Sequence, residues 1–263
     1  MPRLPLAVTG VWLVALCTGC TSVTERGSWG ASAHWPTGKE LRQAAVDAAT
    51  DPMTWIPLAG AAVLAATDLD DDLSEWAADE QPLFGSNAND VSDDLRNLAT
   101  VAYAATALLA PEPKLGDKAK GVAVGMSAIA ITEGITRAGK SLSKRERPNG
   151  QDDESFPSGH ASNATVRYTL AAANLNHLPL PQWAATTLKI GFYGMAGGTA
   201  WARVEAEKHH ATDVLAGYAL GHFIARFMHN AFLEPRDTPM SLQFTPHPSG
   251  GGAITLRYPL GGP

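Results

Sequence analysis

The sequence contains only two cysteines, and both lie near its start, at Cys17 and Cys20. The rest of the chain has no thiol for a disulfide bridge or for thiol chemistry, so packing must stabilise it. Charge is also scarce, because charged residues make up 17% of the chain and the net charge is −6. Nucleic-acid binding needs a basic face, which this balance does not favour. Any anionic substrate must therefore meet a local basic pocket.

Long apolar runs are missing as well. A helix that spans a membrane needs about 20 mostly apolar residues. Polar or charged residues shorten or interrupt the best candidates, which are residues 98–111, 121–131, 191–201 and 214–227. We therefore interpret these segments as core helices of a soluble protein.

The first twenty residues have the features of a targeting segment. Arg3 is followed by an apolar stretch from Leu6 to Leu16, and small residues precede Cys20. This pattern resembles a bacterial lipoprotein signal, which predicts a signal peptide over residues 1–19 and a lipid on Cys20. An ordinary secretory signal with a coincidental cysteine is the alternative. No Asp follows Cys20 as an inner-membrane retention signal, so we expect attachment to the periplasmic face of the outer membrane if the cell has two membranes.

Beyond this segment the pattern is helical. Residues 20–38 are predicted to be a linker, 39–235 an α-helical domain and 236–263 a tail. Asp51 before Pro52 is a typical helix start, and Pro148 must end the preceding helix. The fold class expected is an all-α bundle with a short C-terminal tail resembling a β-hairpin, with strands near 242–245 and 253–258. The helices are predicted near 38–50, 52–66, 73–78, 95–109, 114–143, 158–175, 184–200 and 209–232.

Three motifs carry residues suited to phosphate chemistry. Lys140 and Arg147 come before Pro148, and Arg203 lies far along the chain. Arg offers paired planar donors and Lys a point charge, so three such cations can hold the oxygens of a phosphate. Lys144 and Arg145 also lie here, and we interpret them as cations that merely favour the C-terminus of a helix.

The second motif, Pro157 to His160, places Ser158 and Gly159 in a turn at a helix start. Their backbone N–H groups, and the serine hydroxyl, are expected to donate to a phosphate. A bound phosphate dianion would raise the pKa of His160 and favour a proton on it for a leaving group. The third motif contains His209 and Asp213, which would share one face of a helix, so that the carboxylate orients the ring.

This order and spacing resemble the type 2 phosphatidic acid phosphatase family over about residues 95–230. Its pattern is Lys-x6-Arg-Pro, then Pro-Ser-Gly-His, then Ser-Arg-x5-His-x3-Asp; one departure is Ala202 in place of the serine. The resemblance implies a metal-independent phosphatase without a cofactor. His209 would be the nucleophile that forms a phosphohistidine, His160 the general acid, and Asp213 the residue that orients His209. His210 breaks the spacing and is given no catalytic role.

Two alternatives remain open at this point. The resemblance extends to vanadium-dependent haloperoxidases, and a non-catalytic lipoprotein could also bind phosphate. A cluster of aspartates at 68, 70, 72 and 79 lacks the glycine and the bidentate glutamate of a calcium loop, so a solvated helix start is favoured over a metal site. The substrate could be a lipid phosphate, an isoprenoid pyrophosphate or a soluble ester, selected by residues 69–94. Trp76, Leu83 and Phe84 would form an apolar lip there or, as we favour, belong to the core.

Overall fold

The computed structural model describes residues 29–67, 69–234, 241–246 and 252–257. The predicted signal peptide and Cys20 lie outside these residues. Within them the chain is an all-α bundle, as predicted, with a two-stranded C-terminal hairpin. The elements are α1 (Gly38–Thr50), α2 (Pro52–Ala65), α3 (Leu69–Glu80), η1 (Gly85–Asn87), α4 (Ala88–Leu109), α5 (Leu115–Ser143), α6 (Gly159–Asn174), η2 (Leu175–His177), α7 (Gln182–Glu205), α8 (Ala211–Phe232), β1 (Ser241–Pro246) and β2 (Gly252–Arg257).

Several helices begin and end where the local sequence requires. The Thr37 hydroxyl accepts from the N–H of Glu40, whose carboxylate accepts from the N–H of Thr37, so a capping box opens α1. The Asp51 side chain caps α2 at the Met53 N–H, with Pro52 at the first helical position. These start signals are visible in the sequence, which is why the predicted starts of α1 and α2 are confirmed.

Other boundaries differ from the prediction. Helix α4 begins at Ala88 and not at residue 95, so the mostly polar residues 88–94 form its first turns instead of a loop. Helix α7 extends to Glu205 and so includes Arg203, and α8 begins at Ala211, after His209. Trp29 is 1% exposed, and its indole N–H donates to Asn174, so packed structure begins inside the predicted linker.

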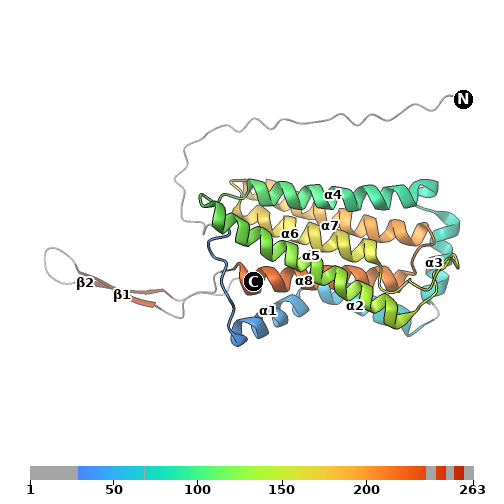
Figure 1. The fold of residues 1–263 in the computed structure, drawn as a ribbon, viewed down its shortest axis with the longest axis horizontal. Helices are drawn as coiled ribbons and strands as arrows, with labels where there is room; N and C mark the ends of the chain where they lie inside the picture. The colour runs from blue at the N-terminus through green and yellow to red at the C-terminus, as the bar shows by residue number, and fades with distance from the viewer. Residues whose placement is uncertain (1–28, 68, 235–240, 247–251, 258–263) are drawn as a thin grey trace, which may run out of the picture.

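Helix α6 lies at the centre, with α4, α5, α7 and α8 packed around it (Figure 1). Helices α1 and α2 cover the outer side of α8, and α3 packs against α7 and α8. Two glycines allow α8 to approach α6 closely. A Cβ atom at Gly217 would lie 2.6 Å from the carbonyl oxygen of Ser158, and one at Gly221 would lie 2.4 Å from that of Ser162. Backbone therefore meets backbone at this contact.

The C-terminal strands β1 and β2 pair antiparallel, with Ser241 opposite Arg257 and Pro246 opposite Gly252. Strand β1 extends the strand expected near 242–245 by one residue at each end, and β2 begins and ends one residue earlier than the strand expected near 253–258. Among the described residues no single helix has both the length and the apolar composition to cross a membrane; the bent pair of α2 and α3 meets the test by length and composition alone.

Candidate active site

The three motifs meet at the end of the bundle where α3 lies (Figure 1). Helices α5 and α7 end there, and α6 and α8 begin there. Consequently Lys140 on the last turn of α5, His160 on the first turn of α6 and Arg203 on the last turn of α7 come together with His209, which lies in the connection to α8.

The three predicted phosphate-binding cations lie within electrostatic range of one another. Burial and then the charge of Arg147 lower the pKa of Lys140, and the same two causes lower that of Arg203 to about 10. Lys140 donates to the Glu154 carbonyl, and Arg147 pairs with Asp152 at 2.5 Å. Like charges held this close repel, and a bound anion would relieve that repulsion.

Arg203 is the most deeply buried of these cations, with 5% of its surface exposed. One terminal nitrogen, Nη1, donates to the Asn89 side-chain oxygen at 2.8 Å and to Ser92 Oγ at 3.0 Å. Its Nε has no hydrogen-bond partner, although it is buried. Buried N–H donors are nearly always paired, so this group is suited to an oxyanion acceptor.

His209 is 2% exposed, and its Nδ1 lies 2.7 Å from the Ser155 carbonyl oxygen. A carbonyl can only accept, so Nδ1 carries the proton. Burial, opposed by Asp213, lowers the pKa of His209 to about 4. The ring is therefore neutral near pH 7, and Nε2 has the lone pair that a nucleophile needs.

The predicted helical pairing of His209 with Asp213 is wrong in its geometry. His209 precedes α8, and its Nδ1 is 3.8 Å from the nearer Asp213 oxygen, which is longer than a hydrogen bond. Asp213 instead accepts from Ser155 Oγ at 2.5 Å and from the His210 N–H at 2.9 Å. Asp213 thus fixes the loop whose carbonyl orients His209.

Sequence reasoning missed Arg145. Its guanidinium lies 2.8 Å from Asp213 and 2.7 Å from Asp70, and it also donates to the Thr212 hydroxyl. Burial acts to raise the pKa of Asp213, but its histidine neighbours, Ser155 and Arg145 outweigh burial and hold that pKa far below its usual range. Arg145 is therefore part of the site and not a mere cation at a helix end. Lys144 beside it is exposed, as expected.

Helix α3 also takes part, which no local pattern indicated. Asp70 is 5% exposed and accepts the Thr212 N–H at 2.8 Å, and Ser74 Oγ accepts the Ala211 N–H at 3.0 Å. The first N–H groups of a helix have no acceptor within it. Residues of α3 supply those acceptors to α8, so Asp70 is not part of a solvated helix start, whereas Asp72 and Asp79 are exposed as that expectation requires.

His160 lies beside Asp93 of α4, with 2.9 Å between Nε2 and the carboxylate. Burial and then Arg203 lower the pKa of His160 to about 4, against the opposing effect of Asp93. In the absence of a ligand the ring is neutral near pH 7. A bound phosphate dianion would raise the pKa of His160, as Asp93 does. It would thereby favour the protonated ring that a general acid requires.

One expectation for the glycine turn is wrong. The N–H of Ser158 donates to the Asp213 carbonyl at 3.0 Å, so it is not available to a phosphate. The Ser158 hydroxyl caps α6 at the Ala161 N–H. Gly159 is the first residue of α6, where N–H groups lack helical acceptors and the dipole attracts anions.

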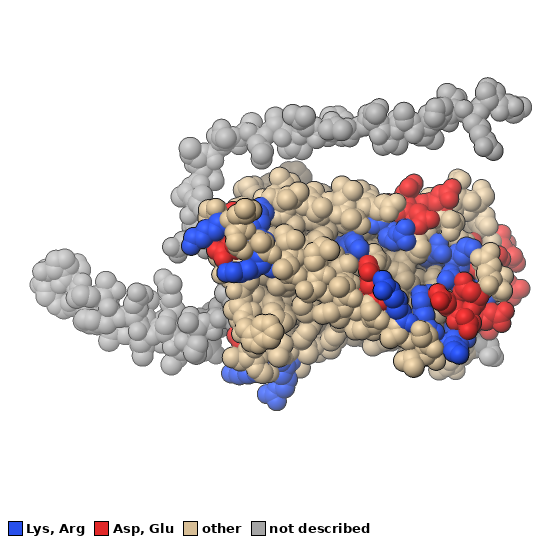
Figure 2. Space-filling model, viewed as in Figure 1, with Lys and Arg blue, Asp and Glu red and all other residues tan. Residues whose placement is uncertain are grey.

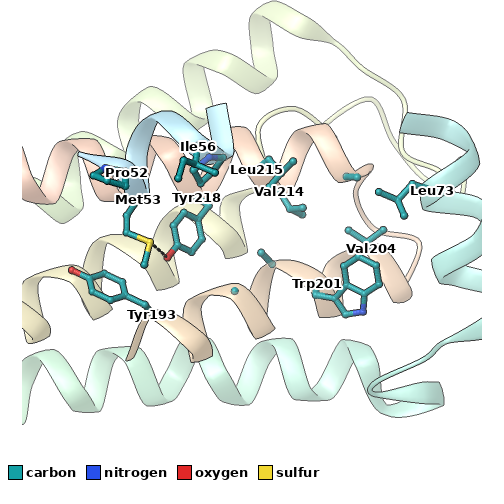
Figure 3. Close-up of a pocket in the computed structure, with 14 residues that line it drawn as sticks. Pro52, Met53, Ile56, Leu73, Tyr193, Trp201, Val204, Val214, Leu215 and Tyr218 are labelled. Carbon is teal, nitrogen blue, oxygen red and sulfur yellow. Dashed lines mark hydrogen bonds between the residues drawn. The ribbon is translucent and has the colours of Figure 1, made fainter. Parts of the chain in front are cut away.

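An apolar cavity beside the site contains none of the predicted site residues. It has a volume of about 460 Å³ and lies between α2, α7 and α8 (Figure 3). It extends from Leu73 and Val204 near the site to Tyr193.

Trp76 and Leu83 are 49% and 69% exposed, so the favoured placement of these two residues in the core is wrong.

A smaller cleft of about 330 Å³ lies between α3 and His210. His210 is the N-cap of α8, and its Nδ1 lies 3.3 Å from Asp213.

No group of three or more His, Cys, Asp or Glu side chains that could hold a metal ion occurs in the part of the chain that the structure describes.

Residues 123–237 match the model of the PAP2 superfamily. The chain is 28% identical to a lipid A 1-phosphatase of Porphyromonas gingivalis over 166 residues, and these residues make up 63% of this chain. This chain spans about a third, 35%, of the length of that relative. A crystal structure described as a transmembrane PAP2-type phosphatidylglycerolphosphate phosphatase from Bacillus subtilis is similar in fold, with a TM-score of 0.53 and 24% identity, over 67% of this chain and 92% of that one.

Proposed function

We propose that this chain, whose residues 123–237 form a PAP2 superfamily domain, is a phosphatase that hydrolyses the phosphate ester of a lipid through a phosphohistidine at His209. The observation that carries the proposal is the state of His209. It is buried and neutral, its Nδ1–H is held by a carbonyl, and the charges of Arg203 and Lys140 act on it. An imidazole used only as a structural cap would not need cations around it.

In the proposed reaction Lys140, Arg147 and Arg203 bind the oxygens of the phosphate. The lone pair on Nε2 of His209 attacks phosphorus as the bond to the ester oxygen breaks in line. His160 gives a proton to the departing oxygen. A water molecule, deprotonated by His160, then attacks phosphorus, the P–N bond breaks, and inorganic phosphate leaves.

The lipid substrate is supported by the name of the relative from Porphyromonas gingivalis, which acts on lipid A. We also propose a place in the cell envelope, with membrane attachment through a lipid on Cys20. That residue follows the apolar stretch and small residues of a lipoprotein signal.

The proposal is tested by turnover of p-nitrophenyl phosphate and by acid-quench labelling. His209→Ala should lose activity by at least about 10³-fold, because the attacking group is gone. The matched control is His210→Ala, which keeps the backbone N–H that Asp213 accepts and should retain most activity.

The quenched wild-type enzyme should carry an acid-labile, base-stable phosphate on residue 209. Vanadate should inhibit, and chelators should not. A label on His210, or full activity in the His209→Ala variant, would refute the proposed nucleophile. Phosphate binding without any turnover would favour a binding protein instead.

A further inference from the structure

One face of the central helix α6, which we call the open face, is partly exposed while the rest is enclosed. Every residue from Ala161 to Asn174 is buried except Asn163 and Arg167. With Gly159 and His160 they follow the spacing of a single helix face. From His160 to Arg167 this open face runs seven residues, or about 10 Å at 1.5 Å per residue. Its members beyond the glycine are all polar, so the face continues from the proposed general acid along the bundle.

The open face is held in place from α5. The Asn163 side-chain N–H donates to Glu133 at 2.8 Å, and Arg167 lies 3.4 Å from the same carboxylate. Arg167 also donates to the carbonyl of Asn163. Its side chain is 14% exposed, so the guanidinium lies within the wall of the bundle and not in free solvent. Burial lowers the pKa of Arg167 although Glu133 opposes that effect, so a further anion would stabilise the charged guanidinium.

Pairs of arginines and carboxylates surround this face. Arg96 of α4 pairs with Asp93 at 3.0 Å, and it acts electrostatically on both His160 and Arg167. Glu133 is shared between Arg167 and Arg137, the latter at 3.6 Å. Arg96 and Arg167 are thus each paired with one carboxylate, and the third arginine, Arg137, is exposed. Figure 1 shows α6 between α4 and α5, which diverge toward the site, and Figure 2 shows charged side chains gathered on this otherwise largely uncharged side.

The reaction geometry gives this face a role. If His160 protonates the departing oxygen, the part of the substrate beyond that oxygen lies on the His160 side of the phosphate. The open face of α6 starts at His160, so the leaving part of the substrate would lie along Asn163 and Arg167.

We infer that Asn163 and Arg167, with Arg96, form a second anion subsite that binds a phosphate or carboxylate carried by the leaving part of the substrate, about 10 Å from the bond that is broken. The inference rests on the proposed function and adds a substrate class to it, namely phosphate esters with a second anionic group. Arginine suits this task because its planar donors match both oxyanions.

The test uses soluble substrates of matched length. Alkanediol bisphosphates of increasing chain length are compared with hydroxyalkyl monophosphates of the same lengths, and kcat/KM is measured from phosphate release. The wild-type protein should prefer the bisphosphate by about 10-fold beyond the statistical factor of about 2, only at lengths that span about 10 Å. Arg167→Gln should remove this preference, and Arg167→Lys should restore part of it. Arg137→Gln is the control, since that side chain is 79% exposed, and it should keep the preference.

The outcomes are separable. A wild-type ratio near the statistical factor at every length overturns the subsite, and so does an unchanged ratio in folded Arg167→Gln. The length dependence of the wild-type protein decides the matter even if that variant does not fold. A preference for bisphosphates but not for phosphate monoesters of ω-hydroxy carboxylic acids of matched length would overturn the carboxylate part of the inference. Absence of phosphate release from all substrates, p-nitrophenyl phosphate included, overturns the proposed function and the inference with it.

Discussion

The Asp213 carboxylate is wholly buried, and the guanidinium of Arg145 is its ionic partner from the loop after α5. Replacement of Arg145 by alanine would leave a buried carboxylate without that charge. Removing one partner of a buried ion pair costs about 3–5 kcal/mol. Here Asp213 keeps Ser155 Oγ and the His210 N–H, and the Arg145 side chain is 32% exposed. We therefore expect a loss of about 2–3 kcal/mol in the free energy of unfolding.

For a protein of this size such a loss lowers Tm by about 5–10 °C. The activity should fall as well, because Asp213 fixes Ser155, and the Ser155 carbonyl orients His209. We expect a loss of about 10–100-fold in kcat, because His209 would be misplaced. KM should change little, because the cations proposed to bind the phosphate remain. Arg145→Lys should be intermediate, since lysine keeps the charge but cannot bridge two carboxylates through a planar fork.

The assay combines thermal melts with p-nitrophenyl phosphate kinetics on Arg145→Ala, Asp70→Asn and the double variant. The two losses should be less than additive, because Arg145 contacts Asp70 at 2.7 Å. Lys144→Ala is the matched control: its side chain is exposed, and its effect should stay within about 0.5 kcal/mol. If Arg145→Ala melts and turns over like Lys144→Ala, the bridge has no role in the site.

Two further predictions concern pH and helix packing. Because the pKa of His209 is lowered to about 4 from its ordinary 6.5, the unfolded chain binds a proton there that the folded chain does not, and stability is lost as pH falls from about 6.5 toward 4. Between pH 7 and 4.5 His209→Gln should lose less stability than wild type, by about 2–3 kcal/mol, and equal acid sensitivity would contradict the assignment. Gly221→Ala should destabilise by at least about 1–3 kcal/mol, since its Cβ would meet the Ser162 carbonyl. Gly134→Ala, with open space around it, should be neutral or stabilising by up to about 1 kcal/mol; similar melts for both would refute the close contact.

Much of the fold could be predicted because its signals are local. Helix α5 ends ahead of Pro148 as predicted, and Asp51 and Pro52 start α2. The start of α4 could not be predicted in this way. Its first turns contain polar residues that resemble a loop, yet acidic side chains are favourable at a helix N-terminus, and Ser92 and Asp93 are used in the site.

The supporting contacts of the site were beyond sequence reasoning because they join distant segments. Nothing near Asp70 indicates that it would accept N–H and hydroxyl groups of Thr212, 142 residues away. Arg145 lies inside the first motif, but its neighbours Lys144 and Arg147 are equally basic, so composition could not single it out. The Ser155 carbonyl carries no side-chain signal at all.

These distant contacts join the segment expected to select the substrate to the segment that contains His209, the proposed nucleophile. Asp70 and Ser74 cap α8 just after His209 and His210. At the other end of the segment, the Glu205 carboxylate, 1% exposed, accepts the N–H groups of Leu83 and Phe84 at 2.9 and 2.8 Å. Residues 70–84 are thus fixed to both sides of the turn between α7 and α8. If this segment selects the substrate as expected, substitutions on its exposed surface should change specificity at unchanged kcat. Substitutions at its fixed points should also lower kcat, because those points hold the turn that contains His209.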